Sequence, residues 1–571
     1  MDSNRQPTRS RPPAAYLLLA LVLLAGLLSA CALTVRDPAA SSPGTGQPLE
    51  SPEGSAGTNG DAVAEATPGT TAEPSPTATP RPLPTASPRP SPTASPAATD
   101  PLPAANAEPG AAGIGDPYFP DMGNGGYDAL HYDLTLTVNP AAQQIEGVSL
   151  MQARAIQALS AFYLDFEQLT IEELLVDGAP AAYEHDDEDQ LVVTPARPLE
   201  AGAEFSVQVT YRGRPVPSSD PAVPAGWYWT AGAATVAAEP FGAQTWFPAN
   251  DHPLDKATFR LEITVPRPLV VASNGLLVET VEEDEATTYV WQARDPMASY
   301  LLTVSIDEYE VHETETADGL PLVSFVPAGG SAGMDAVMGS TAAMIDYFEE
   351  LFGPYPFETY GVIAVQGQLP GFAALETQTR SLFFDVPLDE DILAHELSHQ
   401  WFGDSVSLET WQDIWLKEGV ATYAELLWLE RSQGRAAVNG LVASYYEQMV
   451  RGARAGFYTP PGRPSPDDLY GFPVYQGGAV VLHALRSRIG DAAFFQTLQT
   501  YTERFAYANA GTADLVAVAE EVSGEELSDF MDAWLYDDQP PDLPEQFAPE
   551  ERARLLAPHL AVLGSPDVPA P

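Results

Sequence analysis

The chain has 571 residues, and its 79 acidic and 26 basic residues give a formal net charge of −53. So acidic a chain is a poor candidate for nucleic-acid binding, because that affinity comes largely from basic side chains that neutralise phosphates; we interpret the charge as a solubility feature. The single cysteine, Cys31, excludes disulfides within the chain and thiolate metal sites, so a metal ion has to be held by histidine and carboxylate side chains.

The first 31 residues resemble a bacterial lipoprotein signal peptide. Three arginines precede an apolar run, Tyr16 to Leu28, which is too short for a comfortable membrane span, and Leu28-Ser29-Ala30-Cys31 follows. We therefore expect residues 1–30 to be removed and Cys31 to carry a lipid, which predicts an extracytoplasmic protein anchored to a bacterial membrane. The alternatives are a plain secretory peptide with an incidental cysteine and a short uncleaved anchor; both also export the chain.

Residues 31–115 form a compositionally distinct segment of proline, serine, threonine, alanine and glycine. Such a segment buries too little apolar surface to offset its chain entropy. We expect a disordered linker between the anchor and the folded part of the chain.

An all-β domain is predicted for residues 116–310. Polar and apolar residues alternate from His131 to Val138, which is typical of a half-buried strand, and the same alternation recurs in residues 204–213 and 257–266. Turn residues separate these runs.

From Met334 onward helical periodicity replaces this alternation, so residues 311–545 are predicted to be an α-rich domain. The last part, residues 546–571, ends in a proline-rich stretch and is predicted to be a frayed tail.

A metal site is predicted inside the α-rich domain, where His395, Glu396 and His399 form an H-E-x-x-H motif. A helix places positions i and i+4 on one face, so both imidazoles can bind one zinc ion, and Glu396 is placed to act as a general base. Glu418, with eighteen residues between it and His399, is the candidate third ligand. The alternative is an ordinary amphipathic helix, which does not account for the downstream glutamate.

Several segments around these ligands match a known family. HELSHQWFGD (395–404) and WLKEGVATYAE (415–425) fit an H-E-x-x-H-x18-E ligand set, and EPFGAQTWFPANDHPLDKATF (239–259) and FGPYPF (352–357) fit further family segments. The chain thereby resembles the zinc aminopeptidases of the aminopeptidase N and leukotriene hydrolase family over roughly residues 124 to 540. The resemblance implies a multi-domain fold, an N-terminal all-β, saddle-like domain followed by an α-rich, thermolysin-like catalytic domain with one zinc ion.

The resemblance also implies carboxylates that bind the free amino terminus of a peptide. Glu376 retains the acid of the family's G-A-M-E-N loop, although Ala373, Leu375 and Thr377 replace the glycine, methionine and asparagine. Glu239, just before the F-P-x-x-D segment, is the second amine-binding candidate; the alternative is a surface acid.

Two further roles are carried over from the family or from position. Tyr475 matches a tyrosine that donates a hydrogen bond to the reacting carbonyl oxygen, with Tyr470 as the fallback, although the family's lysine two residues later is lost. Asp413, five residues before Glu418, is a candidate support for the metal ligands or else a solvated charge.

Together these features predict a tethered, extracytoplasmic zinc aminopeptidase that acts on peptides. The helical C-terminal domain of many relatives is not expected here, so the cleft is predicted to be more open. The alternatives are an endopeptidase, if Glu239 and Glu376 do not face the zinc, a catalytically silent peptide-binding surface lipoprotein, and a hydrolase of a non-peptide substrate. The sequence does not indicate the preferred residue or the oligomeric state.

Overall fold

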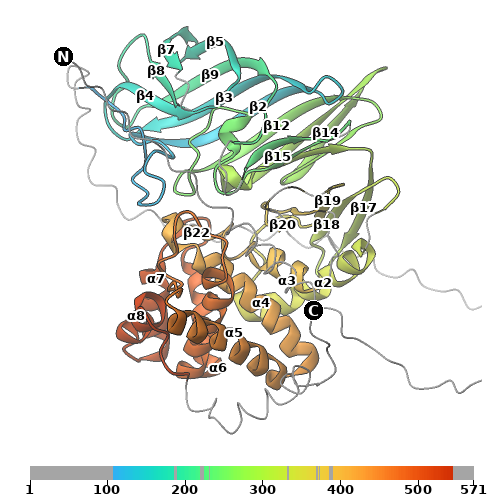
Figure 1. Cartoon of the computed structure of the whole chain (residues 1–571). Coiled ribbons are helices and arrows are strands. Elements are labelled where there is room, and N and C mark those ends of the chain that lie inside the picture. Colours follow the sequence, from blue (N-terminus) through green and yellow to red (C-terminus); the bar gives the residue numbers. More distant parts are fainter. Residues whose placement is uncertain are drawn as a thin grey trace, which may run out of the picture. The chain divides into compact units, whose positions relative to one another are not determined.

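The structure of the chain is a computed structural model in which the following residues are described: 107–543 apart from 186–189, 219–223, 231, 331–332, 368, 370, 372 and 385–389 (Figure 1). The predicted signal peptide (1–30), the lipidation site Cys31, the linker up to residue 106 and the tail (546–571) lie outside the described residues. No described helix is long and apolar enough to cross a membrane.

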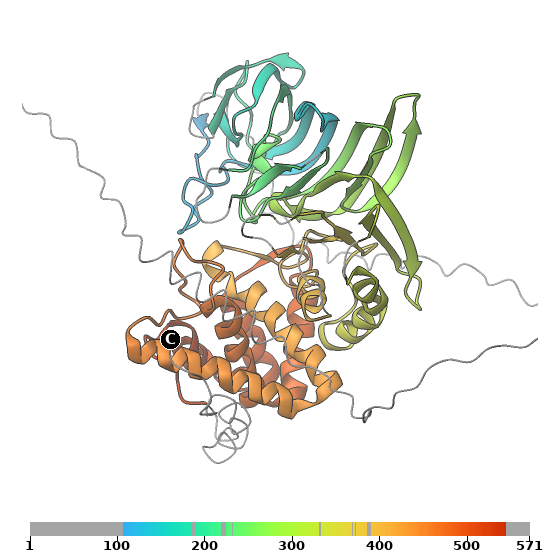
Figure 2. The ribbon, with the colours of Figure 1, turned by 45° about the vertical axis from the view of Figure 1, so that its right-hand side comes forward.

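The N-terminal domain is built on an eight-stranded sheet whose strands lie side by side in Figure 2. Its strand order is β14-β15-β12-β2-β3-β9-β5-β6, and β12 pairs in parallel with β2 at the centre. The polar–apolar alternation of the sequence buries every second residue of β12. The bounds are β2 (Tyr127–Asn139), β3 (Gln144–Ala155), β5 (Thr170–Val176), β6 (Ala179–Pro180), β9 (Glu204–Gly213), β12 (Lys256–Pro266), β14 (Leu276–Glu282) and β15 (Ala286–Ala298).

Two four-stranded sheets complete this domain. The first has the order β1 (Glu108–Pro109), β4 (Leu159–Asp165), β8 (Gln190–Thr194) and β7 (Ala182–His185). The second has the order β10 (Gly226–Trp229), β11 (Ala234–Ala237), β16 (Val304–Asp307) and β13 (Val270–Ser273). Strand β11 ends two residues before Glu239 and therefore fixes the position of that side chain.

The predicted linker is wrong at its end, because described structure begins at residue 107 and not at 116. Strand β1 pairs with β4, and the Gly110 amide donates to the Ala161 carbonyl at 2.9 Å. Asp116, 2% exposed, accepts hydrogen bonds from the Trp411 amide at 2.8 Å and faces His252 Nε2 at 3.1 Å. Backbone hydrogen bonds and one buried acid therefore order a segment that carries little apolar surface.

The second domain combines a small sheet with helices. The sheet has the order β17 (Tyr309–Glu315), β18 (Pro321–Pro327), β19 (Val362–Ala364), β21 (Ser381–Phe383) and β20 (Ala374–Leu375), so β20 is an edge strand. The helices are α2 (Met334–Phe352), α3 (Glu390–Ser398), α4 (Trp415–Gln433), α5 (Arg435–Ala455), α6 (Gly478–Arg504), α7 (Thr512–Ser523) and α8 (Ser528–Tyr536). The predicted succession of a β domain and an α-rich domain is confirmed; the strands of two or three residues were too short to show a periodicity.

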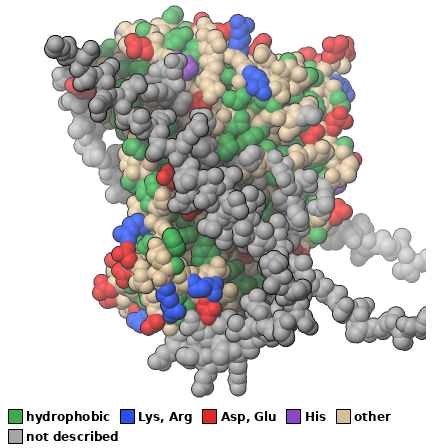
Figure 3. All heavy atoms as spheres, in the orientation of Figure 1, with side chains coloured by type: hydrophobic (Ala, Val, Ile, Leu, Met, Phe, Trp, Pro, Cys, Tyr) green, Lys and Arg blue, Asp and Glu red, His purple; other side chains and the backbone are tan. Residues whose placement is uncertain are grey.

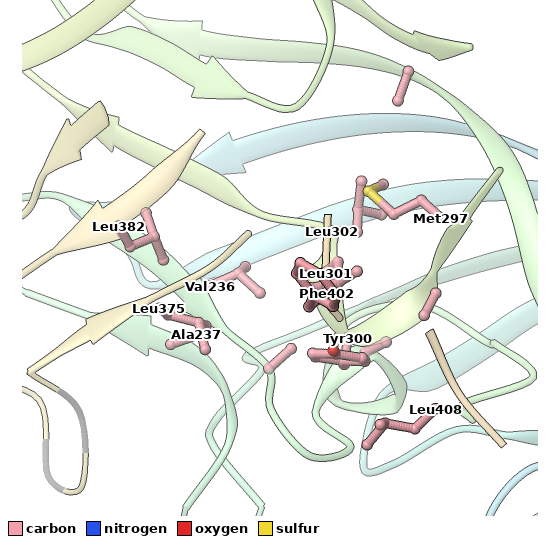
Figure 4. Close-up of a cluster of buried hydrophobic side chains, with 14 of the residues drawn as sticks. Val236, Ala237, Met297, Tyr300, Leu301, Leu302, Leu375, Leu382, Phe402 and Leu408 are labelled. Atoms are coloured by element: carbon pink, nitrogen blue, oxygen red, sulfur yellow. The ribbon is translucent and has the colours of Figure 1, made fainter. Parts of the chain in front are cut away.

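One hydrophobic core runs through both domains (Figure 4). Val236 and Ala237 of β11 belong to the same cluster as Leu375 of β20 and Leu382 of β21. Burial of such side chains contributes about 25 cal/mol per Å² of apolar surface. This shared core fixes Glu239, which follows β11, and Glu376, which follows β20, in one place.

The acidic side chains on one face of the molecule are dispersed. On the face seen in Figure 3 they lie at several separate places, with arginines among them. This distribution agrees with the interpretation of the charge as a solubility feature.

Candidate zinc and substrate site

The three predicted metal ligands meet where α3 packs against α4. Glu418 Oε2 lies 3.2 Å from His395 Nε2 and 3.6 Å from His399 Nε2. One donor atom from each of these three residues lies within 4.8 Å of the others. Two imidazole nitrogens and one carboxylate oxygen at these separations fit a zinc ion, which binds such donors at about 2.0–2.2 Å.

The opposite ring nitrogens of the histidines are also engaged, and this orients both imidazoles. His395 Nδ1 lies 2.7 Å from Glu425 Oε1, and His399 Nδ1 lies 3.0 Å from the Phe402 carbonyl. Such contacts direct the Nε2 atoms toward the metal position. Glu425 was not predicted, although it follows Glu418 by seven residues, two helical turns along the same face of α4.

Asp413 does not support the ligands. Its carboxylate accepts hydrogen bonds from the Thr512 hydroxyl at 2.5 Å and the Thr410 hydroxyl at 3.4 Å. The Asp413 side chain thus contacts Thr512, the first residue of α7, and not the metal ligands. The prediction that Asp413 supports the ligands is wrong because Asp413 lies in a short 3-10 turn (Trp411–Asp413) and not in the helix that carries Glu418.

Glu396 lies beside the ligands and lines the same cavity as His395. Its side chain is buried, with 7% of the residue exposed. Burial raises the pKa of Glu396 to about 8, and the neighbouring Glu376 and Glu418 carboxylates act in the same direction. A carboxylate with a pKa near neutrality is suited to accept and return a proton.

Both candidate tyrosines line the cavity. The Tyr475 ring stacks on the His395 ring, with centroids 5.7 Å apart and an interplanar angle of 10°. Tyr470 Oη is buried and has no hydrogen-bond partner among the described residues. The stacking on a ligand places Tyr475 beside the metal position, and Tyr470 lines the same cavity.

The predicted amine-binding carboxylates lie next to the metal ligands. Glu239, Glu376 and Glu418 each place one oxygen within 4.8 Å of the others. Lys417 joins them: its Nζ donates to Glu239 Oε1, to Glu376 Oε1 at 2.7 Å and to Glu418 Oε1 at 2.7 Å. Burial and the Glu376 charge raise the pKa of Glu239. The sequence analysis did not predict that Lys417 belongs to the site. Two features of the sequence could have indicated it: Lys417 directly precedes Glu418, and the chain has only two lysines.

A cavity of about 310 Å³ opens onto these groups, and its lining residues are Glu239, Gly371, Ala373, Ala374, Ile392, His395, Glu396, Glu425, Tyr470 and Tyr475. Ala374 belongs to the edge strand β20. An edge strand can pair with an extended peptide through its backbone. The cavity thus brings together the ligand His395, the base Glu396, the carboxylate Glu239 and an edge strand, and Glu376 lies buried next to Glu239.

Sequence comparisons agree with this geometry. The profile of the peptidase M1 N-terminal domain matches residues 128–301, and that of the peptidase family M1 domain matches residues 337–534. An M1 zinc metallopeptidase of Deinococcus radiodurans has a similar structure, with a TM-score of 0.70 and 33% identity, covering 76% of this chain and 99% of that one. The chain belongs to peptidase family M1.

Other members of peptidase family M1 extend the comparison. A variant of the Deinococcus radiodurans metallopeptidase bound to a Tyr-Ser-Ala substrate gives a TM-score of 0.70 at 32% identity, covering 76% of this chain and 99% of that one. Aminopeptidase M1 of Arabidopsis thaliana is 28% identical over 323 residues, or 52% of this chain and 36% of that protein. Human glutamyl aminopeptidase is 26% identical over 318 residues, covering 52% and 33% respectively. The chain spans about a third of the length of these two relatives.

Proposed function

We propose that this member of peptidase family M1 is a zinc aminopeptidase that releases the N-terminal residue of peptides. The observation that carries the proposal is the position of Glu239 and Glu376 beside the ligand Glu418. Two carboxylates at that place can bind the α-ammonium group of a peptide by charge-assisted hydrogen bonds. The first peptide bond then lies at the metal position, and the enzyme acts as an exopeptidase.

The chain's own residues divide the chemistry among them. His395, His399 and Glu418 hold the zinc ion, which when bound polarises the scissile carbonyl and acidifies water. Glu396 takes the proton of the attacking water and passes it to the leaving amine. The Tyr475 hydroxyl donates a hydrogen bond to the carbonyl oxygen as negative charge develops on that oxygen.

The place of action is proposed from the sequence alone. The arginine-rich leader, the apolar run and Cys31 support export followed by lipid anchoring of a bacterial protein. Peptides outside the cytoplasm are then the substrates. Labelling of cells with a radioactive fatty acid, with Cys31→Ser as the control, tests this: the wild-type chain is expected to carry label and the variant none.

The activity is tested with aminoacyl anilides and the same compounds N-acetylated, using the purified full chain with and without a chelator. Chelator-sensitive cleavage of the free-amine compounds alone is expected, because only they carry the ammonium group. Glu396→Gln is the control for the chemistry and is expected to lower kcat by about 10²–10⁴-fold.

The remaining outcomes decide against the proposal in different ways. Equal cleavage of the acetylated compounds indicates an endopeptidase with an open cleft. No cleavage by zinc-loaded protein, together with binding of free peptides, indicates a catalytically silent peptide-binding protein.

A further inference from the structure

Lys417 is completely buried and lies at the centre of three carboxylates from three different elements. Its side chain is 0% exposed, and it extends from α4 toward Glu239 after β11 and Glu376 after β20. Its third contact is with Glu418 on its own helix. The Tyr300 ring, whose centroid is 5.7 Å from Nζ, packs against the same ammonium group. This cation therefore joins both domains at the substrate site.

We infer that Lys417 is a positioning residue that sets the amine-binding carboxylates and the ligand Glu418 in one fixed arrangement. The inference rests on the proposed aminopeptidase function, because it concerns how the enzyme recognises the α-ammonium group. Lys417 has no exposed surface, and its Nζ is engaged by three carboxylates, so it acts through those carboxylates and does not contact the peptide.

The two oxygens of Glu418 show how this arrangement serves the metal. Oε1 accepts the hydrogen bond from Lys417 at 2.7 Å, whereas Oε2 faces His395 Nε2 at 3.2 Å. Lys417 thus determines which oxygen is left for the metal. Partners that hold a ligand in this way typically contribute about 10–100-fold to metal affinity.

The charges explain why a cation is needed behind the amine-binding pair. Glu239 is 4% exposed and Glu376 is 2% exposed, so their mutual repulsion is weakly screened. Lys417 donates to one oxygen of each. Without it, the two carboxylates are expected to move apart, and this change removes part of the ammonium site.

Lys256, the only other lysine, provides a matched control. Its Nζ also reaches from the β domain into the second domain, donating to the carbonyls of Asp404 at 2.9 Å and Ser405 at 3.0 Å. It contacts neither Glu239 nor Glu376 in the described structure. Lys256→Met therefore removes a half-buried lysine between the same domains without touching the carboxylates.

The experiment compares Lys417→Met with Lys256→Met in the full chain. Two probes are used, leucine hydroxamate and its analogue that lacks the α-amino group. The dissociation constant of the analogue divided by that of leucine hydroxamate is called the amine ratio; a high value means that the protein recognises the amine. Zinc affinity is measured separately by competition with a chromophoric chelator. We expect Lys417→Met to lower the amine ratio at least 30-fold and the zinc affinity about 10–100-fold, and Lys256→Met to change each less than threefold.

The inference is overturned if Lys417→Met leaves either quantity within threefold of the wild type. If the single variant does not fold, the test uses Lys417→Met/Glu239→Gln, which loses one charge of each sign. Measured against Glu239→Gln alone, the double variant is expected to lower the amine ratio a further tenfold, and an unchanged ratio again rejects the inference. A wild-type protein that does not distinguish the two probes contradicts the proposed aminopeptidase function itself.

Discussion

Two groups of buried carboxylates in this protein are stabilised in different ways. Around Lys417, three glutamates share one ammonium group. In the β domain, Asp165, Asp251 and Asp255 form no salt bridge with any described residue and instead accept hydrogen bonds from backbone amides. Burial raises the pKa of these three aspartates to about 7, about 6 and about 8 respectively.

The contrast separates the two ways of burying an acid. Hydrogen bonds from amides satisfy the oxygens of a carboxyl group but do not offset the full cost of burying its charge. A lysine offsets part of that cost: Lys417 lowers the pKa of Glu376 against the opposing effect of burial, whereas burial and the Glu376 charge still raise the pKa of Glu239. Recognition of an ammonium group requires a charged carboxylate, and Glu376 beside Lys417 meets that requirement, whereas Asp165, Asp251 and Asp255 have no lysine or arginine partner among the described residues.

The largest expected difference between the two groups is in catalysis. Glu376→Gln is expected to lower kcat/KM for aminoacyl anilides about 10–150-fold, since a hydrogen bond to a charged group contributes about 1.5–3 kcal/mol. Asp255→Asn, the same change from acid to amide in the β domain, is the matched control and is expected to stay within threefold of the wild type. Steady-state kinetics of both variants make the comparison, which fails if they lose activity equally.

A second prediction concerns two acids near the ligand Glu418. Glu425→Gln is expected to lower zinc affinity at least tenfold, because a neutral amide orients His395 less well than a carboxylate. Asp413→Asn is expected to leave zinc affinity unchanged, because Asp413 contacts Thr512. Chelator competition measures both. Equal losses in the two variants contradict the assignment of these acids.

A third prediction concerns the effect of Asp255 on stability. Its pKa is raised from 3.8 to about 8 by burial, so the folded state binds a proton that the unfolded state releases. The stabilisation from Asp255 is complete below about pH 4 and is lost as the pH rises through about 8, at up to about 1.4 kcal/mol per pH unit. Asp255→Asn is therefore expected to flatten the dependence of the free energy of unfolding on pH between 4 and 8, as measured by urea titration in the presence of zinc. An unchanged slope means that this carboxyl is ionised when buried.

The metal site was predictable from the sequence because helix geometry fixes it. His395 and His399 are one turn apart, and this spacing alone places both imidazoles together. The pairing of Glu239 with Glu376 has no such local rule, since residues 137 positions apart meet only through the shared core; family resemblance supplied it.

Long-range contacts account for what was missed. The sequence does not show that Lys417 turns inward to two other elements, nor that Asp116 accepts a hydrogen bond from the Trp411 amide. Glu425 was predictable in principle, since it shares a face of α4 with Glu418.

The inward position of Lys417 has a consequence for protein chemistry. The chain contains only two lysines, Lys256 and Lys417, and Nζ of each is engaged by two or more oxygen atoms. An acylating reagent such as an N-hydroxysuccinimide ester is thus expected to spare both side chains in the folded protein and to modify them once the domains separate. The fraction of acylated Lys417, measured by mass spectrometry, therefore reports how often the two domains separate at the residue that joins them.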